Sequence, residues 1–211
     1  MSNAKYIPAL SFKWLTPFFD VLVEGPMSAL RIRKDLVAQA GDLNGKRVLD
    51  VGCGTGTLAM MVKQAYPAAD VVGLDGDPQI LEIARSKAKK RGLEIRFEHG
   101  MSFALPYPDA SFDVVLTSFM LHHLTREDKQ KTATEMYRVL CFGGRLLGAD
   151  ITEARNFVIK AILPLTRHFE RVEDNLDGFL PIMFETAGFK DYAEVCRYLI
   201  KSISIFQGSK A

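Results

Sequence analysis

Short apolar runs alternate with longer stretches of helical periodicity from residue 46 onward. Five runs rich in β-branched and apolar residues predict strands at residues 47–51, 70–75, 94–99, 112–118 and 145–150. Runs of this kind are typical of a parallel sheet that is buried on both faces and whose strands are joined by crossing helices. The pattern therefore predicts an α/β fold with a mostly parallel, doubly wound sheet.

Two helices between these strands have clear sequence signals. Asp77 is a suitable N-cap for a helix after the second strand, Pro78 suits its first turn, and Gly92 suits its C-terminal end. Residues 126–140 place apolar side chains on one face and charges on the other. Both helices are expected to pack against the sheet.

The C-terminal part of the chain adds a helix over residues 174–187 and two extended runs at 192–198 and 203–207. The two runs are expected to close the sheet with an antiparallel edge hairpin. No repeat and no Pro/Gly/Ser-rich linker interrupts this pattern, so a single domain over residues 1–211 is expected.

The composition narrows the class of partner. The 27 Lys and Arg residues nearly balance the 25 Asp and Glu residues, and the net charge of +2 gives no reason to expect nucleic acid or an anionic membrane. The three cysteines are scattered and form no CxxC pair, which predicts neither a disulfide framework nor a metal site. With no secretory leader and no long apolar stretch, we expect a cytoplasmic protein that binds a small molecule.

The sequence DVGCGTG at residues 50–56 places three glycines directly after the first predicted strand. There the backbone must turn sharply and can approach a ligand closely. The GxGxG spacing, with an acid two residues before the first glycine, differs from the GxGxxG of dinucleotide-binding folds. A second acid, Asp75, ends the next strand, where it can bind ribose hydroxyls or cap the following helix. The two features together predict a nucleotide-like ligand.

Four successive segments resemble the ordered motifs of class I methyltransferases that use S-adenosyl-L-methionine (SAM), and most of all those of the ubiquinone/menaquinone methyltransferase-like group. The segments are VLDVGCGTGTL, VVGLDGDPQIL, LPYPDASFDVVLTSFMLHHL and MYRVLCFGGRLLGAD. The resemblance implies a Rossmann-like, seven-stranded, mostly parallel sheet with an antiparallel edge strand, and SAM as the methyl donor that leaves as S-adenosyl-L-homocysteine. It divides the expected domain into a helical N-terminal lid, a SAM-binding core, and an acceptor-side segment with the sheet edge, at residues 1–41, 46–150 and 151–211.

The resemblance also implies the cofactor residues. The acid and glycines of the first motif hold the methionine part of SAM, the acid of the second takes the ribose hydroxyls, and the residues after it flank the adenine. The full set is Asp50, Gly52, Cys53, Gly54, Thr55, Gly56, Asp75, Gly76, Asp77, Met101, Ser102, Thr117 and Ser118. Met101 stands where relatives usually carry an acid for the adenine amino group, and a lost hydrogen bond of this kind costs about 1 kcal/mol.

Methyl transfer from a sulfonium is an in-line displacement, and holding the reactants in contact contributes roughly 7–11 kcal/mol by itself. A catalytic base is therefore optional. His122 and His123 follow the fourth strand, where acceptor sites of the family lie, and a positioned base adds about 10²–10⁴ in rate. The resemblance favours His123, since a His-Leu pair recurs there in relatives that methylate small amines. A role for either ring in orienting loops or cofactor stays open.

Two apolar stretches are available to form the acceptor pocket. One carries Trp14 among other aromatic residues near the N-terminus, and the other is residues 157–163. If they form a lid rather than merely cover the sheet, they predict a small apolar or aromatic acceptor. Thr117-Ser118-Phe119-Met120 lacks the Asn/Asp-Pro-Pro-aromatic motif of base-amino methyltransferases, which argues against nucleic acid. A non-catalytic SAM-binding module and a nicotinamide-dependent oxidoreductase remain the alternatives.

Overall fold

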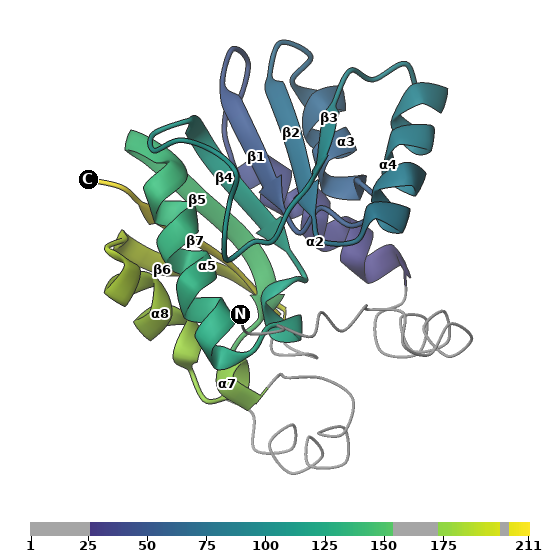
Figure 1. Cartoon of the computed structure of the whole chain (residues 1–211). Coiled ribbons are helices and arrows are strands. Elements are labelled where there is room, and N and C mark those ends of the chain that lie inside the picture. The colour runs from purple at the N-terminus through teal and green to yellow at the C-terminus, as the bar shows by residue number, and fades with distance from the viewer. Residues whose placement is uncertain (1–25, 154–172, 199–202) are drawn as a thin grey trace, which may run out of the picture.

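The computed structural model describes residues 26–153, 173–198 and 203–211. Its strands are β1 (Arg47–Val51), β2 (Asp70–Asp75), β3 (Arg96–His99), β4 (Phe112–Ser118), β5 (Leu140–Ile151), β6 (Lys190–Tyr198) and β7 (Ile203–Ser209). They form one seven-stranded sheet in the order β3-β2-β1-β4-β5-β7-β6 (Figure 1). Strands β1 to β5 pair in parallel, and β7 runs antiparallel to both β5 and β6. The predicted fold class and the C-terminal hairpin are confirmed.

Helices cover both faces of the sheet (Figure 1). The helices α2 (Pro26–Gln39), α3 (Thr57–Ala65) and α4 (Pro78–Lys90) share one buried apolar cluster with the sheet. On the other face, α5 (Arg126–Val139) and α8 (Phe179–Ala187) share a second cluster. Two short elements, the 3-10 turn η1 (Leu121–His123) and α7 (Glu173–Leu176), lie near the carboxyl ends of β4 and β5.

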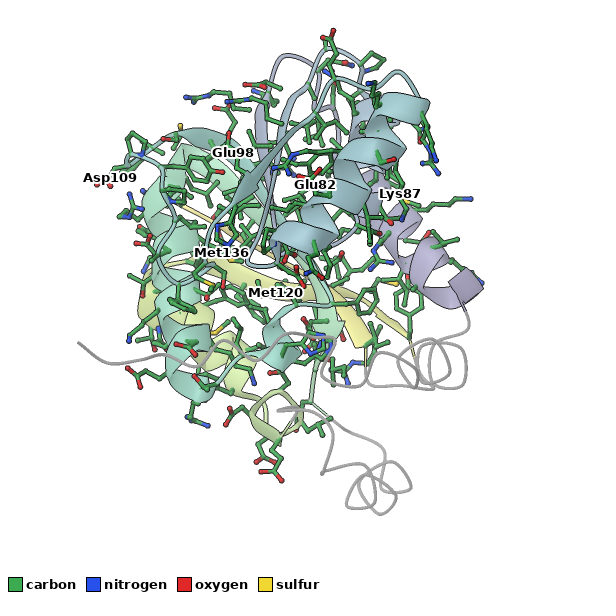
Figure 2. The ribbon with its side chains drawn as sticks, turned by 45° about the vertical axis from the view of Figure 1, so that its right-hand side comes forward. Glu82, Lys87, Glu98, Asp109, Met120 and Met136 are labelled. Carbon is green, nitrogen blue, oxygen red and sulfur yellow. The ribbon has the colours of Figure 1, made fainter. Side chains whose placement is uncertain are left out.

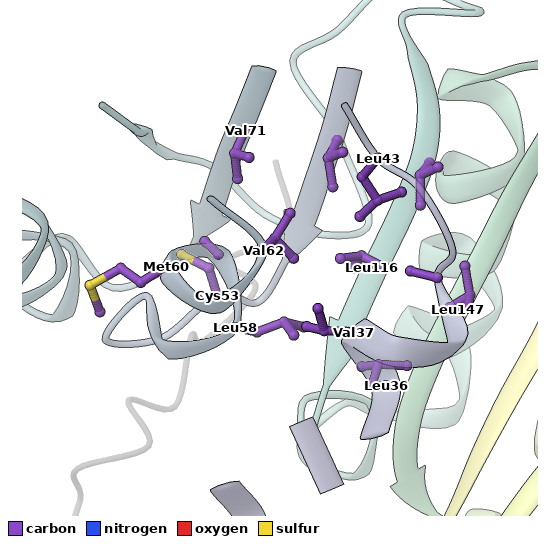
Figure 3. Packing of buried hydrophobic residues seen from close by; sticks show 14 of the residues in the cluster. Leu36, Val37, Leu43, Cys53, Leu58, Met60, Val62, Val71, Leu116 and Leu147 are labelled. Carbon is purple, nitrogen blue, oxygen red and sulfur yellow. The ribbon is translucent and has the colours of Figure 1, made fainter. Parts of the chain in front are cut away.

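The first cluster fixes α2 against the rest of the fold. Leu36 and Val37 of α2 pack beside Leu58 and Val62 of α3, over Leu116 of β4 (Figure 3). Full burial of an aliphatic side chain of this size contributes about 1.5–3 kcal/mol. The side chains on the inner face of α2 are therefore held firmly above the carboxyl half of the sheet.

The end signals of α4 act as predicted. The Asp77 carboxylate accepts hydrogen bonds from the backbone N–H groups of Gln79 and Ile80, at 2.8 and 3.4 Å, and Pro78 occupies the first turn. Gly92, just after the helix, adopts a φ of 65°. Local chemistry alone is enough to fix both ends of this helix.

Several predicted boundaries were wrong, and three of them change how the elements are described. Strand β3 begins at Arg96 rather than at residue 94, and β5 begins at Leu140, which pairs with Phe112, rather than at residue 145. The glycine pair Gly143-Gly144 therefore lies inside β5. The helix expected over residues 174–187 is two helices, because Gly178 adopts a φ of 80° between them.

The lid and the acceptor wall remain predictions. Trp14 and its aromatic neighbours, and residues 157–163, lie outside the described residues, and of the expected lid only the part from Pro26 onward is described. That part is α2, which contacts α3 and β5. Among the helices that the structure describes, none is long and apolar enough to cross a lipid bilayer.

Candidate functional site

The predicted site residues gather where the parallel strands end. The glycine loop joins β1 to α3, and the ends of β2 and β4 lie on either side of it because both strands pair with β1. Ligands of open α/β sheets bind at this edge, beside the point where the strand order reverses. The site is therefore built from segments far apart in the sequence.

The three loop glycines all have positive φ but serve different purposes. A Cβ on Gly52 would lie 2.2 Å from the Cγ of Met120, and one on Gly56 would lie 2.7 Å from the ring of Phe97. These two positions need glycine because a neighbouring side chain fills the space that a Cβ would occupy. Figure 2 shows one of these side chains, Met120, at the lower end of the sheet. A Cβ on Gly54 would meet nothing within 4 Å. Gly54 is thus the position where the loop backbone is open to a ligand.

Asp50 lies beneath this loop and is fully buried. Its Oδ2 accepts a hydrogen bond from the Ala59 N–H at 3.1 Å, whereas its Oδ1 has no hydrogen-bond partner among the described residues. Burial raises the pKa of Asp50 to about 7, against the opposing effects of Arg33 and the Ala59 amide. A buried carboxylate oxygen without a donor is costly, and a bound ammonium group would satisfy it.

Asp75 ties the loop to the end of β2. Its Oδ2 accepts a hydrogen bond from the Gly54 N–H at 2.8 Å, and its Oδ1 accepts one from the Asp77 N–H at 2.9 Å. Asp77, not Asp75, caps α4, so the capping alternative for Asp75 does not hold. Each carboxylate oxygen has a second lone pair, which suits the two hydroxyls of a ribose.

Two other loop residues make contacts within the protein. The Cys53 side chain is buried in the first apolar cluster, and burial raises the pKa of its thiol, so it packs rather than reacts. Thr55 accepts a hydrogen bond through Oγ1 from the Lys87 ammonium at 2.8 Å, which joins the loop to α4. Figure 2 shows Lys87 on α4. Both contacts help to hold the loop in its conformation.

Polar groups of the residues expected beside the adenine already have hydrogen-bond partners within the protein. Ser102 is buried, and its hydroxyl lies 2.9 Å from that of Thr132 on α5. Met101, which stands in place of the usual acid, forms an isolated β-bridge with Ala104. The Gly76 carbonyl lies 3.2 Å from His99 Nε2. His99 carried no motif signal, and it reaches this position because it is paired with Asp75 in the sheet.

The end of β4 forms the opposite wall. The buried Thr117 hydroxyl donates to the Val51 carbonyl at 3.0 Å, which joins the ends of β1 and β4. Ser118 Oγ accepts from Arg33 Nε at 3.2 Å. Phe119 follows with a φ of 56°, a conformation that costs a non-glycine residue of order 1–3 kcal/mol and clusters at functional sites.

His122 is held by Asp150, a residue that the sequence analysis did not select. His122 Nδ1 lies 2.7 Å from Asp150 Oδ1, and both side chains are buried. Asp150 also accepts from the N–H groups of Met120, Leu121 and Ile151. Burial alone would raise the pKa of Asp150, but the His122 ring, the Ile151 N–H group and the His123 ring outweigh it and hold the pKa below its usual value. The ionised carboxylate therefore fixes the proton on Nδ1 and makes Nε2 the acceptor in the neutral ring.

His123 stacks beside this pair, with 4.0 Å between the two ring centroids. It keeps an exposed surface, yet the surrounding protein atoms, followed by the His122 ring, lower its pKa to about 4. A ring with this pKa is neutral near pH 7 and is a weak base. The low pKa of His123 and the contact between His122 and Asp150 make His122 the stronger candidate for the proton acceptor, in place of His123, which the resemblance favours.

Two further polar residues adjoin the pair. Asn175 of α7 donates to the Ile151 carbonyl at 2.9 Å and lies 3.5 Å from Asp150. Lys129 of α5 is fully buried, with its Nζ 3.5 Å from Asp174. Helical periodicity gave no signal for a buried lysine, because its partner is 45 residues away in the sequence.

The part of the chain that forms this site is similar to known proteins. Residues 48–144 match the family model described as a methyltransferase domain. A demethylmenaquinone methyltransferase of Thermus thermophilus is 37% identical over 202 residues, covering 95% of this chain and 86% of the relative. The solved YcgJ protein of Bacillus subtilis is 27% identical with a TM-score of 0.68, covering 82% of this chain and 72% of that one.

A second solved structure, of the S-adenosylmethionine-dependent methyltransferase SibL, is 25% identical with a TM-score of 0.71. The similarity covers 90% of this chain and 58% of that one. The matched region contains the glycine loop, both acids and the histidine pair. The chain belongs to the class I SAM-dependent methyltransferases of the ubiquinone/menaquinone type.

Proposed function

We propose that this protein transfers the methyl group of SAM to a small aromatic acceptor resembling a quinone ring, with His122 as the base. One observation carries the proposal: the open glycine loop and the buried Asp150–His122 pair lie at the same edge of the sheet. The relative named a demethylmenaquinone methyltransferase, which matches nearly the whole chain, supports a quinone-like acceptor.

The residues around the loop fit SAM. Gly54 leaves space where a ligand can lie against the backbone, Asp75 suits the ribose, and the buried Asp50 Oδ1 lacks a donor that an α-ammonium group would supply. When bound, SAM provides a methyl group on a positively charged sulfur. Thr117 and Ser118 lie at the end of β4, and we propose that they flank that sulfur.

On the acceptor side, His122 would remove a proton from the acceptor while the methyl carbon exchanges its bond to the SAM sulfur for a bond to the acceptor, which leaves S-adenosyl-L-homocysteine. Asp150 keeps the ring in the tautomer whose Nε2 accepts, and its negative charge stabilises the imidazolium that results. The proton then leaves His122 to solvent. For a hydroquinone ring, the net change is one methyl group gained and one proton lost by the acceptor.

A panel of acceptors tests the proposal with labelled SAM. A hydroquinone or phenol should be methylated with a kcat/KM well above that of a free amino acid or a sugar, whose polar groups an apolar pocket would leave unpaired. Highly polar acceptors as the best substrates would refute the acceptor class. Binding of SAM without any turnover across the panel would favour the non-catalytic alternative.

A further inference from the structure

Asn175 of α7 is a buried polar residue beside the Asp150–His122 pair, and the proposed reaction does not use it. Its side-chain Nδ2 donates to the Ile151 carbonyl at 2.9 Å and lies 3.5 Å from Asp150 Oδ1. The same carboxylate oxygen contacts His122 Nδ1 and accepts from the Ile151 N–H, each at 2.7 Å. Asn175 is therefore one of three groups placed around the oxygen that holds the histidine ring.

The orientation of the Asn175 amide is fixed by these neighbours. The Ile151 carbonyl and the ionised Asp150 carboxylate are both acceptors, so only the NH₂ group of the amide can face them. The amide oxygen must point elsewhere, and it is buried without a hydrogen-bond partner among the described residues. A buried oxygen of this kind lowers stability, and a leucine would fill a similar volume without that cost. This indicates that the amide is present for its contacts with Asp150 and Ile151 rather than for packing.

Ion pairs anchor the short helix α7 that carries this amide. Asp174, the preceding residue, accepts from Arg126 Nη1 at 2.9 Å and lies 3.5 Å from the buried Lys129 Nζ, and both of these residues belong to α5. The guanidinium carbon of Arg126 also lies 3.9 Å from the centre of the Phe179 ring of α8. Figure 1 shows α7 beside the lower end of α5. The amide is thus held in place by α5 and α8, which lie outside the sheet.

We propose that Asn175 is a positioning residue for the methyl transfer, which holds the Asp150 carboxylate against His122 and so keeps Nε2 of the ring free to accept a proton. A neutral amide suits this role, since it donates to the carboxylate and neither takes up nor releases a proton near pH 7. A ring fixed in this way presents its base nitrogen in one direction, and small misplacements of a reacting group are costly. The inference rests on the proposed function, since it assumes that His122 is the base.

Asn175→Leu tests this role, because it keeps a similar volume and removes both contacts. In the folded variant, kcat with a hydroquinone acceptor should fall about 10- to 100-fold, whereas affinity for S-adenosyl-L-homocysteine should change less than about twofold. Gln130→Met is the matched control. Gln130 of α5 also donates from a side-chain amide to a backbone carbonyl, that of Met183 on α8 at 3.2 Å, but this contact does not involve Asp150. Its loss should leave kcat unchanged.

The Nδ1 proton of His122 gives a readout that does not depend on turnover. Because this proton lies between a buried ring and a buried carboxylate, it should exchange slowly with water and give a downfield NMR signal. The signal is assigned by its loss in His122→Ala. Asn175→Leu should shift the signal and speed its exchange, whereas Gln130→Met should do neither.

The absence of this protected signal from the unchanged protein would overturn the inference whether or not the Asn175 variant folds. An unchanged signal or an unchanged kcat in a folded Asn175→Leu protein would do the same. An equal loss of kcat and of S-adenosyl-L-homocysteine affinity would overturn it in favour of a general structural role. If the unchanged protein methylated no acceptor, the proposed function would fail, and the NMR signal would still show whether Asn175 holds the pair.

Discussion

Replacing Gly54 with alanine separates the cost of backbone strain from the cost of blocking the ligand. Gly54 has a φ of +52° and no atom within 4 Å of the position of a Cβ. Gly45, in the loop before β1, has a φ of +70° and equally open surroundings, so Gly45→Ala is a matched control. A left-handed conformation costs an alanine about 1–2 kcal/mol. Each variant should therefore lose about 2–8 °C in Tm for a domain of this size.

Only Gly54→Ala should lose affinity for S-adenosyl-L-homocysteine. An extra methyl group forced into occupied space typically costs 1–3 kcal/mol, which corresponds to about a 5- to 150-fold weaker Kd. Isothermal titration calorimetry of both variants measures the difference, and thermal unfolding shows whether the strain is matched. Equal affinities in the two variants would mean that the ligand does not approach the loop at Gly54.

Asp75→Ala should weaken S-adenosyl-L-homocysteine binding about tenfold or more, since a carboxylate hydrogen bond contributes about 1.5–3 kcal/mol. The matched change at the exposed Asp70 of β2 should leave this binding unchanged. A loss under about twofold, judged by calorimetry, would move the ribose contact elsewhere. His122→Ala should lower kcat by about 10²–10⁴ with little change in donor affinity, and more than His123→Ala does. An equal loss of donor binding and rate would assign His122 to cofactor orientation. His123 has a pKa of about 4 in the folded protein against 6.5 for the free side chain, so its contribution to stability is complete above pH 6.5 and is lost as the pH falls toward 4. Denaturant unfolding across this range should show a weaker pH dependence in His123→Gln, and an unchanged dependence would contradict the lowered pKa of the ring.

Features set by neighbouring residues could be predicted from the sequence. The ends of α4 follow from Asp77, Pro78 and Gly92, each of which acts within a few residues of itself. The parallel core follows from apolar runs long enough to be buried on both faces. The start of β5 did not follow, because it depends on the pairing of Leu140 with Phe112 across the sheet.

Some residues of the candidate site could likewise be predicted from the sequence, whereas others could not. The glycine loop and Asp75 are marked by spacing along the chain, but Asp150 meets His122 only because β5 pairs with β4. Arg33 reaches Ser118 from 85 residues away, through the packing of a helix that no motif marks. Contacts of this kind depend on the three-dimensional fold, and the sequence pattern contained no signal for them.

Transfer of a deuterated methyl group from SAM to a demethylated hydroquinone tests the central claim most directly. Mass spectrometry of the extracted acceptor should show one added trideuteromethyl group. The product should be nearly absent with His122→Ala and with Gly54→Ala at low SAM concentration. An acceptor recovered without the label, from a protein shown by calorimetry to bind SAM, would contradict the account.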